Sequence, residues 1–148
     1  MSAAVVLNST PLGILCHPRT PPHVRTCRRC VRDLLAAGRR VIVPEITDYD
    51  IRRELIRLGS TLALSNLDDY GTQLEYLPLT TAAMRLAAEL RAQARRNGRP
   101  TAPDPALDGD VILAAQALTL NNPVVIATGN PAHLSRFVPA ELWSNIAP

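Results

Sequence analysis

Polar and acidic side chains follow three short apolar runs of the sequence. Asn8-Ser9-Thr10 comes after the first run and Thr128-Gly129-Asn130 after the last. Four acids come soon after the second run, and two more begin an apolar segment further on: Glu45, Asp48, Asp50, Glu54, Asp108 and Asp110. Crowded carboxylates repel one another unless a cation neutralises them, and oxygen ligands suit Mg²⁺ or Mn²⁺. A carboxylate-held cation of this kind is a common device for hydrolysing phosphodiesters.

Each acid also has an ordinary structural interpretation. Asp48, Asp50 and Glu54 belong to an expected helix, where acids near the N-terminus interact favourably with the helix dipole. Asp108 is a good N-cap residue, and Asp110 would then be a first-turn acid. The functional interpretation depends on the acids meeting at one place.

Three apolar runs predict buried strands that would bring them together. They cover Val5–Leu7, Arg40–Val43 and Val124–Ala127, and they lack the polar alternation of a half-exposed strand. Helices are expected between them, over residues 22–37, 48–58, 62–74, 80–98 and 109–118. This alternation predicts an α/β fold with a mainly parallel sheet covered on both faces. Ligand sites in such sheets lie beyond the carboxyl ends of the strands.

The remaining segments give weaker signals. Tyr76–Leu79 resembles a short edge strand because it contains a proline, and residues 143–146 are expected to form a last strand. Pro100–Pro105 is expected to be a loop that carries Asp104. The leucines and alanines around Leu86 and Leu90 form an apolar face, explained by core packing or by a dimer interface.

Length and composition restrict the class of protein. The chain has 148 residues, 47% of them apolar and 20% charged, which predicts one globular domain over residues 1–148. No run approaches the roughly 18 apolar residues of a membrane span. The N-terminus has no basic leader, and three cysteines make a disulfide framework improbable. We therefore expect a cytoplasmic protein with no membrane association.

All 16 basic residues are arginines, and the net charge is +3. Aromatic residues make up 3%, too few for an extended base-stacking platform. The best candidates for phosphate contacts are the arginines next to Asp50 and Glu54 in the sequence, which are Arg52, Arg53 and Arg57. Two arginine series at helical spacing, around Arg28 and Arg95, are expected to be mainly solvated helix faces.

Cysteine and histidine residues cluster near the N-terminus. Cys27 and Cys30 have the spacing of a zinc half-site, with Cys16, His17 and His23 nearby. The second pair of ligands is absent, however, and the segment is expected to be helical. Buried thiols are therefore favoured over zinc.

Four segments together resemble a PIN-domain ribonuclease. Val5–Leu12 is similar to the family's first strand and the helix after it. Val43-Pro44, together with Asp50, is similar to the segment that carries the family's second acid. Asp110–Ala117, which reads DVILAAQA, resembles the helix that carries the third acid. Val125–Asn130 resembles the strand and Thr-x-Asn turn before the fourth.

The resemblance implies a three-layer α/β/α fold with an acidic pocket that holds Mg²⁺ or Mn²⁺. It also implies RNA hydrolysis that leaves 5′-phosphates. VapC-type toxins are commonly homodimers that a small antitoxin protein inhibits, so both kinds of partner are expected. In this chain Asp50, Asp110, Asn8 and Asp108 would form the catalytic and metal-holding set. Contacts to RNA would come from Arg53, Ser9, Thr128, Asn130 and His133.

The chain departs from the family pattern in its acids. Asn8 stands where the first Asp is expected, His133 stands where the fourth acid often falls, and Asp50 replaces a Glu. An amide offers a neutral oxygen and no bridging carboxylate, so weaker metal binding and lower activity are expected. Three explanations of Asn8 are open: an engineered change, natural degeneration of the site, or a site rearranged around Asp108 and His133. Asp108 and Glu45 are additional acids that could compensate for the missing carboxylate.

The favoured hypothesis is a metal-dependent endoribonuclease, toxin-like and impaired by Asn8. The alternative is a catalytically inactive PIN-like module that binds RNA or a protein. A small-molecule-binding α/β domain is disfavoured because no glycine-rich phosphate loop follows any strand.

Overall fold

The computed structural model describes residues 2–96 and 104–148, and it contains a five-stranded sheet. The strands are β1 (Ala4–Leu7), β2 (Val41–Pro44), β3 (Glu75–Leu77), β4 (Val124–Thr128) and β5 (Ala140–Leu142). Their order in the sheet is β3-β2-β1-β4-β5, and every neighbouring pair is parallel. β1 is therefore central, and the carboxyl ends of all the strands meet at one edge.

Alternate residues of the central strands face two different cores. Val5 and Leu7 of β1 pack into one core, whereas Ala4 and Val6 pack into the other. Both faces are buried because helices cover both, which explains the unbroken apolar runs in the sequence.

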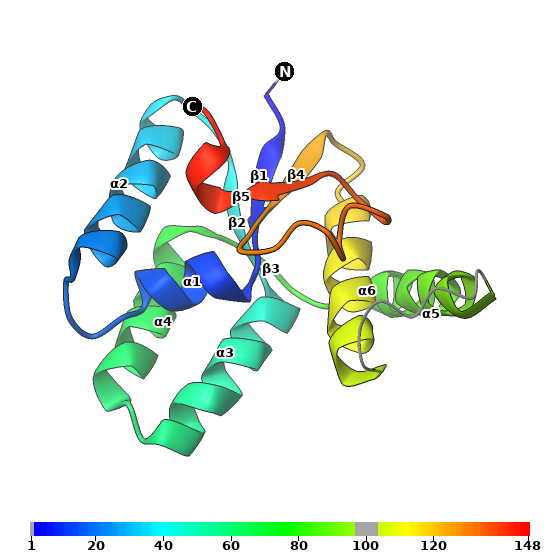
Figure 1. The fold of residues 1–148 in the computed structure, drawn as a ribbon, viewed down its shortest axis with the longest axis horizontal. Helices are drawn as coiled ribbons and strands as arrows, with labels where there is room; N and C mark the ends of the chain where they lie inside the picture. The colour runs from blue at the N-terminus through cyan, green and yellow to red at the C-terminus, as the bar shows by residue number, and fades with distance from the viewer. Residues whose placement is uncertain (1, 97–103) are drawn as a thin grey trace.

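In the described residues, six helices cover the two faces of the sheet, so that the sheet is the middle of three layers (Figure 1). The helices α1 (Ser9–Leu15), α2 (Pro22–Ala36), α3 (Glu45–Leu58) and α4 (Thr61–Gln73) contribute to the core that contains Val5. On the other side lie α5 (Thr81–Arg96) and α6 (Asp104–Leu118), with α6 against the sheet and α5 against α6. The predicted three-layer α/β/α fold is confirmed.

The end of α3 follows the sequence signal closely. Gly59 adopts a left-handed conformation with φ of 68°, which terminates the helix in a conformation that other residues adopt at a cost. α4 begins two residues later, so α3 and α4 form a helical hairpin beside α1 (Figure 1).

Arg39 ties the two ends of the chain together. Its guanidinium donates hydrogen bonds to the Ala3 carbonyl at 2.8 and 2.9 Å and to the Ala147 carbonyl at 2.7 Å. Ala3 precedes β1, and Arg39 itself precedes β2. Both chain ends therefore lie at the amino edge of the sheet, where Figure 1 marks them N and C.

Four sequence expectations require correction. The helix expected from Asp48 begins at Glu45, directly after β2. The helix expected from Gly109 begins at Asp104, because Leu107 already packs against α5. The last strand is Ala140–Leu142, paired with β4, and residues 143–145 form a 3₁₀ turn instead. The edge strand β3 spans 75–77 rather than 76–79. Most of the expected loop at 100–105, and the expected end of α5 at 97–98, lie outside the described residues.

The apolar face of α5 packs within the molecule. Leu86 and Leu90 contact the cluster that Leu107, Val111 and Ala115 of α6 form. Core packing therefore accounts for this face.

Candidate functional site

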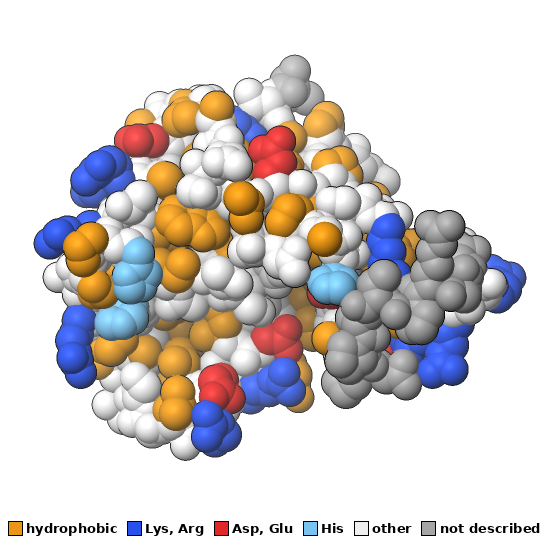
Figure 2. All heavy atoms as spheres, viewed as in Figure 1, with side chains coloured by type: hydrophobic (Ala, Val, Ile, Leu, Met, Phe, Trp, Pro, Cys, Tyr) orange, Lys and Arg blue, Asp and Glu red, His pale blue; other side chains and the backbone are white. Residues whose placement is uncertain are grey.

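A cleft of about 380 Å³ opens at the carboxyl edge of the sheet. Its lining includes Asn8 from the end of β1, Asp50 and Arg53 from α3, and Asp110 from α6. Ser9 also lines it. Three segments that are far apart in the sequence thus bring two carboxylates and an amide into one cavity. Figure 2 shows acidic and basic side chains next to one another on the surface over α3.

Asn8 is held by hydrogen bonds on both sides of its amide. It is the N-cap of α1, and its Oδ1 accepts from the Ser9 backbone N–H at 2.7 Å. Its Nδ2 donates to the Thr128 hydroxyl oxygen at 3.0 Å. Thr128 is buried, and its hydroxyl oxygen also accepts from the Asn130 N–H at 3.2 Å. The Thr128 turn therefore orients Asn8 rather than lining the cleft itself.

Asp50 lies in the cleft beside a positive charge. Its carboxylate is 3.5 Å from the Arg53 guanidinium, and its side chain is 29% exposed. Burial raises the pKa of Asp50, and the nearby Arg53 only partly offsets that increase. The Asp50 carboxylate thus carries a desolvation cost that a second cation would relieve.

Asp110 has a similar environment on the other wall. Burial raises the pKa of its carboxyl, the positive charges of His133 and Arg136 lower it, and the negative charge of Asp50 raises it again. His133 therefore lies within electrostatic reach of Asp110, as expected for a residue near the site. Asp50 and Asp110 line the same cleft, and Asp110 lies within electrostatic reach of the Asp50 charge.

The other predicted acids serve different purposes. Asp108 is outside the cleft lining and forms an ion pair with Arg91 at 2.7 Å. Glu45 accepts a hydrogen bond from the Leu79 N–H at 2.7 Å, which fixes the segment after β3. Glu54 pairs with Arg57 on the exposed face of α3. A site rearranged around Asp108 therefore finds no support in this geometry.

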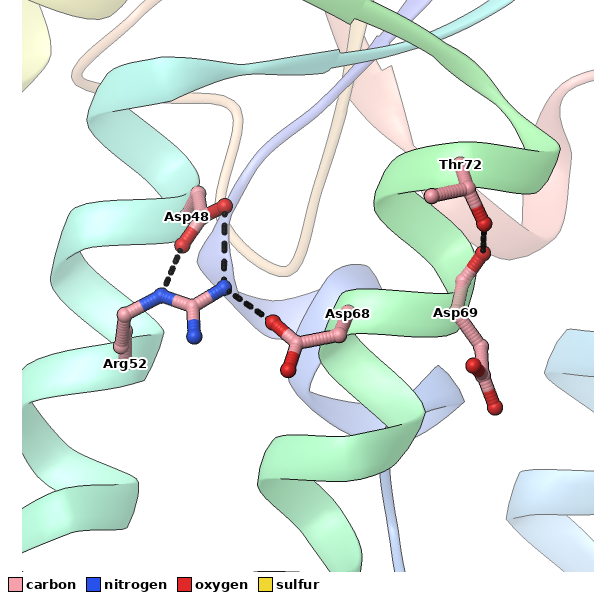
Figure 3. A network of polar contacts seen from close by, with 5 residues as sticks. All are labelled: Asp48, Arg52, Asp68, Asp69 and Thr72. Carbon is pink, nitrogen blue, oxygen red and sulfur yellow. Dashed lines mark hydrogen bonds and ion pairs between the residues drawn. The ribbon is translucent and has the colours of Figure 1, made fainter.

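Asp48 faces away from the cleft and joins α3 to α4 (Figure 3). Its carboxylate is nearly buried and accepts from Arg52 Nε at 2.8 Å. Arg52 also reaches Asp68 of α4 at 2.8 Å. Arg52 is thus engaged between two carboxylates, which leaves Arg53 as the better placed arginine for a ligand in the cleft.

Gln116 is a positioning residue that the sequence did not single out. It is fully buried in α6, and its Oε1 accepts from the Ile46 N–H at 3.1 Å while its Nε2 donates to the Leu77 carbonyl at 2.9 Å. It therefore satisfies a free N–H in the first turn of α3, the helix that carries Asp50. The only signal in the sequence was one amide within an apolar helix.

Gly129 permits the close approach of β4 to α1. A Cβ at this position would lie 2.8 Å from Thr10 Cγ2 and 2.9 Å from Thr10 Oγ1. Any side chain at 129 would displace Thr10, two residues after Asn8. The glycine of the Thr128-Gly129-Asn130 turn thus has a steric role, and the Asn130 side chain stabilises the turn by accepting from the Ala132 N–H at 3.2 Å.

The donor set of the cleft fits one hard divalent cation. Mg²⁺ is commonly held by one or two carboxylates, with water and substrate phosphates completing the coordination. Asp50 and Asp110 supply two carboxylates, and the Asn8 carbonyl oxygen retains one lone pair beside its hydrogen bond to Ser9. Across residues 2–96 and 104–148, no three His, Cys, Asp or Glu side chains converge as a metal-holding group. The cleft thus offers a sparse site rather than a closed cage.

The cysteines behave as buried thiols rather than zinc ligands. Cys16 and Cys27 are buried, and burial raises the pKa of each to about 12. Cys27 Sγ lies 3.8 Å from the Pro11 carbonyl, whereas Cys30 is only partly buried. Within the described part of the chain, no zinc-binding group accompanies them.

A second hollow of about 390 Å³ lies between α2 and α4. Arg25, Arg28, Arg29 and Arg32 line it together with apolar side chains, and its described lining contains no carboxylate. Arg28 is partly structural, because it donates to the carbonyls of Leu15 and His17 at the end of α1. This hollow therefore does not suit cation-dependent chemistry.

Comparison with solved structures supports the PIN-like fold. The chain is similar to a structure of VapBC2 from Rickettsia felis bound to a promoter DNA fragment, with a TM-score of 0.74, 17% identity, and coverage of 95% of this chain and 98% of the other. VapBC-1 from nontypeable Haemophilus influenzae gives a TM-score of 0.70 at 15% identity, with 96% and 99% covered. DNA-bound VapBC from Salmonella typhimurium gives 0.65 at 22% identity, again with 96% and 99% covered.

The likeness is one of fold and extends over nearly the whole chain. No protein-family model and no curated protein matches the sequence. The predicted resemblance to the VapC-type PIN fold is confirmed at the level of architecture. In the described residues, no helix is long and apolar enough to cross a membrane.

Proposed function

We propose that this chain is a metal-dependent endoribonuclease of the PIN type that acts as the toxin of a toxin–antitoxin pair. The observation that supports the proposal is the meeting of Asn8, Asp50 and Asp110 in one cleft at the carboxyl edge of a PIN-like sheet. Solved structures of similar fold include VapBC2 and VapBC-1, which supports a protein partner.

Asp50 and Asp110 would hold Mg²⁺ or Mn²⁺, with Asn8 as a weaker third donor. The bound cation supplies a water of lowered pKa and neutralises the charge that develops on the phosphate. Arg53, on the rim beside Asp50, would bind a phosphate of the RNA backbone. Ser9 lines the cleft next to Asn8 and would orient the same phosphate, and His133 would balance charge near Asp110.

The alternative function is a PIN-like module that binds RNA or a protein without cleaving RNA. The amide of Asn8 favours it, because both ends of that amide are engaged by Ser9 and Thr128 and it brings no charge to the cleft. The two functions differ in cation affinity and in turnover.

Cleavage of mixed structured RNAs with Mn²⁺ tests the proposal. We expect slow cleavage by the chain and none by Asp110→Asn, which removes one of two carboxylates with little change in volume. Asp69→Asn is the matched control, because Asp69 is exposed on α4, and it should cut like the unmodified chain. Cleavage by Asp110→Asn at the unmodified rate would refute the proposed site.

The variant Asn8→Asp separates the two functions. If only Asn8→Asp cleaves RNA, the fold supports a nuclease and this chain is the inactive module. If neither cleaves RNA although both bind it, the binding function holds.

A further inference from the structure

Tyr49 is an exposed aromatic residue beside the cleft. The chain has five aromatic side chains, and Tyr70, Phe137 and Trp143 pack against the hydrophobic cores. Tyr76 lies near Asp48 and is 37% exposed. Tyr49 is 57% exposed, so more than half of its surface is accessible to a ligand.

The ring of Tyr49 is linked to the cleft through Arg53. The two residues are one helical turn apart on α3, and the Arg53 guanidinium carbon lies 5.4 Å from the centroid of the ring. Arg53 itself lines the cleft and pairs with Asp50 at 3.5 Å. The Arg53 guanidinium therefore lies within reach of both the Asp50 carboxylate and the Tyr49 ring.

This arrangement corresponds to the parts of a nucleotide. A phosphate at the cleft would meet Arg53, and the base next to that phosphate would lie one step further out, at the ring. Aromatic rings stack on unpaired bases and tolerate any sequence, since every base has a π-face. A base within a duplex is already stacked on its neighbours and cannot reach the ring.

We propose that Tyr49 stacks on an unpaired nucleobase adjacent to the phosphate in the cleft. The inference rests on the proposed function for the identity of the ligand as RNA. It assigns a base-contacting role to a residue outside the acidic set.

The test measures binding of a single-stranded RNA decamer of mixed sequence in EDTA, where metal-dependent cleavage cannot proceed. Tyr49→Ala is expected to weaken binding about 5- to 30-fold, in the range that stacking on one base contributes. Tyr49→Phe should stay within about twofold, because the ring remains. Ile56→Ala is the control, since Ile56 is 62% exposed on the same helix but has no aromatic ring that could stack on a base.

A scan with abasic nucleotides distinguishes stacking from mere support of Arg53. At one position an abasic substitution should weaken binding by the unmodified chain as much as Tyr49→Ala does, and it should cost Tyr49→Ala nothing further. An equal loss for Tyr49→Ala on every RNA, abasic or intact, would mean that the ring only positions Arg53. That result would overturn the inference, as would equal affinity for duplex RNA.

The outcomes separate this inference from the nuclease proposal. If the chain cleaves RNA and Tyr49→Ala binds like the unmodified chain, the inference fails and the nuclease stands. If Tyr49 contributes to binding while no variant cleaves, stacking stands and hydrolysis fails. If the chain binds no RNA and Tyr49→Ala instead weakens capture of a protein partner, both proposals fail.

Discussion

Position 8 determines how much negative charge the cleft offers to a cation. Asn8→Asp would add a third carboxylate to Asp50 and Asp110 and keep the N-cap of α1, because Asp caps helices as well as Asn. The Thr128 hydroxyl would reverse its role and donate to the new carboxylate, at the same 3.0 Å contact. We expect at least tenfold tighter Mn²⁺ binding by calorimetry, and a lower free energy of unfolding in EDTA, because three carboxylates in one cleft repel one another when no cation is bound. Equal Mn²⁺ affinity in the two proteins would contradict this account.

The buried thiols make a separate prediction about alkaline pH. The pKa values of Cys16 and Cys27 are about 12 in the folded protein and 9.0 in the free side chain. Their stabilising effect is therefore complete below pH 9 and is lost as the pH rises from 9 toward 12, because the unfolded state releases these protons first. The free energy of unfolding should fall by up to about 1.4 kcal/mol per pH unit for each thiol.

Urea denaturation at pH 8, 8.5 and 9 measures this slope while the tyrosines, whose ordinary pKa is 10.0, remain mostly protonated. Cys27→Ala should have about half of the slope of the unmodified protein, whatever its stability at pH 8. A slope that is the same in both proteins would show that the thiols do not carry the effect. Iodoacetamide at pH 8 should label the partly buried Cys30 first.

For the helix α6, the sequence predicts its presence but not where it begins. Its apolar segment and Asp110 were recognisable because a buried helix next to a strand end has a clear pattern. The sequence does not predict its start at Asp104, because a glycine such as Gly109 is typical of a helix boundary. Packing of Leu107 against α5 overrides that local preference. The pairing of Ala140–Leu142 with β4 was missed for a similar reason, since a three-residue edge strand has almost no pattern of its own.

The residues of the site could be predicted from the sequence, but the residues that orient them could not. Sequence order placed Asn8, Asp50 and Asp110 at strand ends, and the structure brings all three to one cleft. The partners that orient them were not predictable, because the contacts of Thr128 with Asn8 and of Gln116 with Ile46 join residues 120 and 70 positions apart. The roles of the site residues and the single-domain organisation stay predictions.

Gln116 links three elements, so its removal should weaken the site through α3. Gln116→Leu preserves the volume but leaves the Ile46 N–H and the Leu77 carbonyl without partners in the core. Each unsatisfied group costs about 1–3 kcal/mol, so we expect a loss of about 2–5 kcal/mol in the free energy of unfolding. Gln73→Leu, at an exposed position of α4, should change it little. A loss below about 1 kcal/mol for Gln116→Leu would contradict this role.

For the whole molecule, the charge distribution predicts a modest dependence of RNA binding on salt. The net charge is +3, and several arginines are paired with acids, among them Arg40, Arg52, Arg57 and Arg91. Each phosphate contact with a single strand contributes a slope of about −0.7 to log K against log salt. We expect a total slope no steeper than about −3, measured between 50 and 300 mM salt.

Arg53→Gln should make that slope shallower by about 0.7, because one phosphate contact is lost. Arg57→Gln is the matched control, since Arg57 lies on the same helix, is paired with Glu54 and does not line the cleft. An unchanged slope for Arg53→Gln would show that Arg53 does not contact a phosphate.

The hydrogen bonds of Arg39 have a practical consequence for handling the protein. They hold residues 3 and 147 at the amino edge of the sheet, whereas the cleft opens at the carboxyl edge. A tag, a fluorophore or a surface linker attached next to Ala3 or Ala147 would therefore lie on the side of the sheet opposite the cleft. A chain anchored by its ends would present the cleft outward, accessible to a polymer much larger than the protein itself.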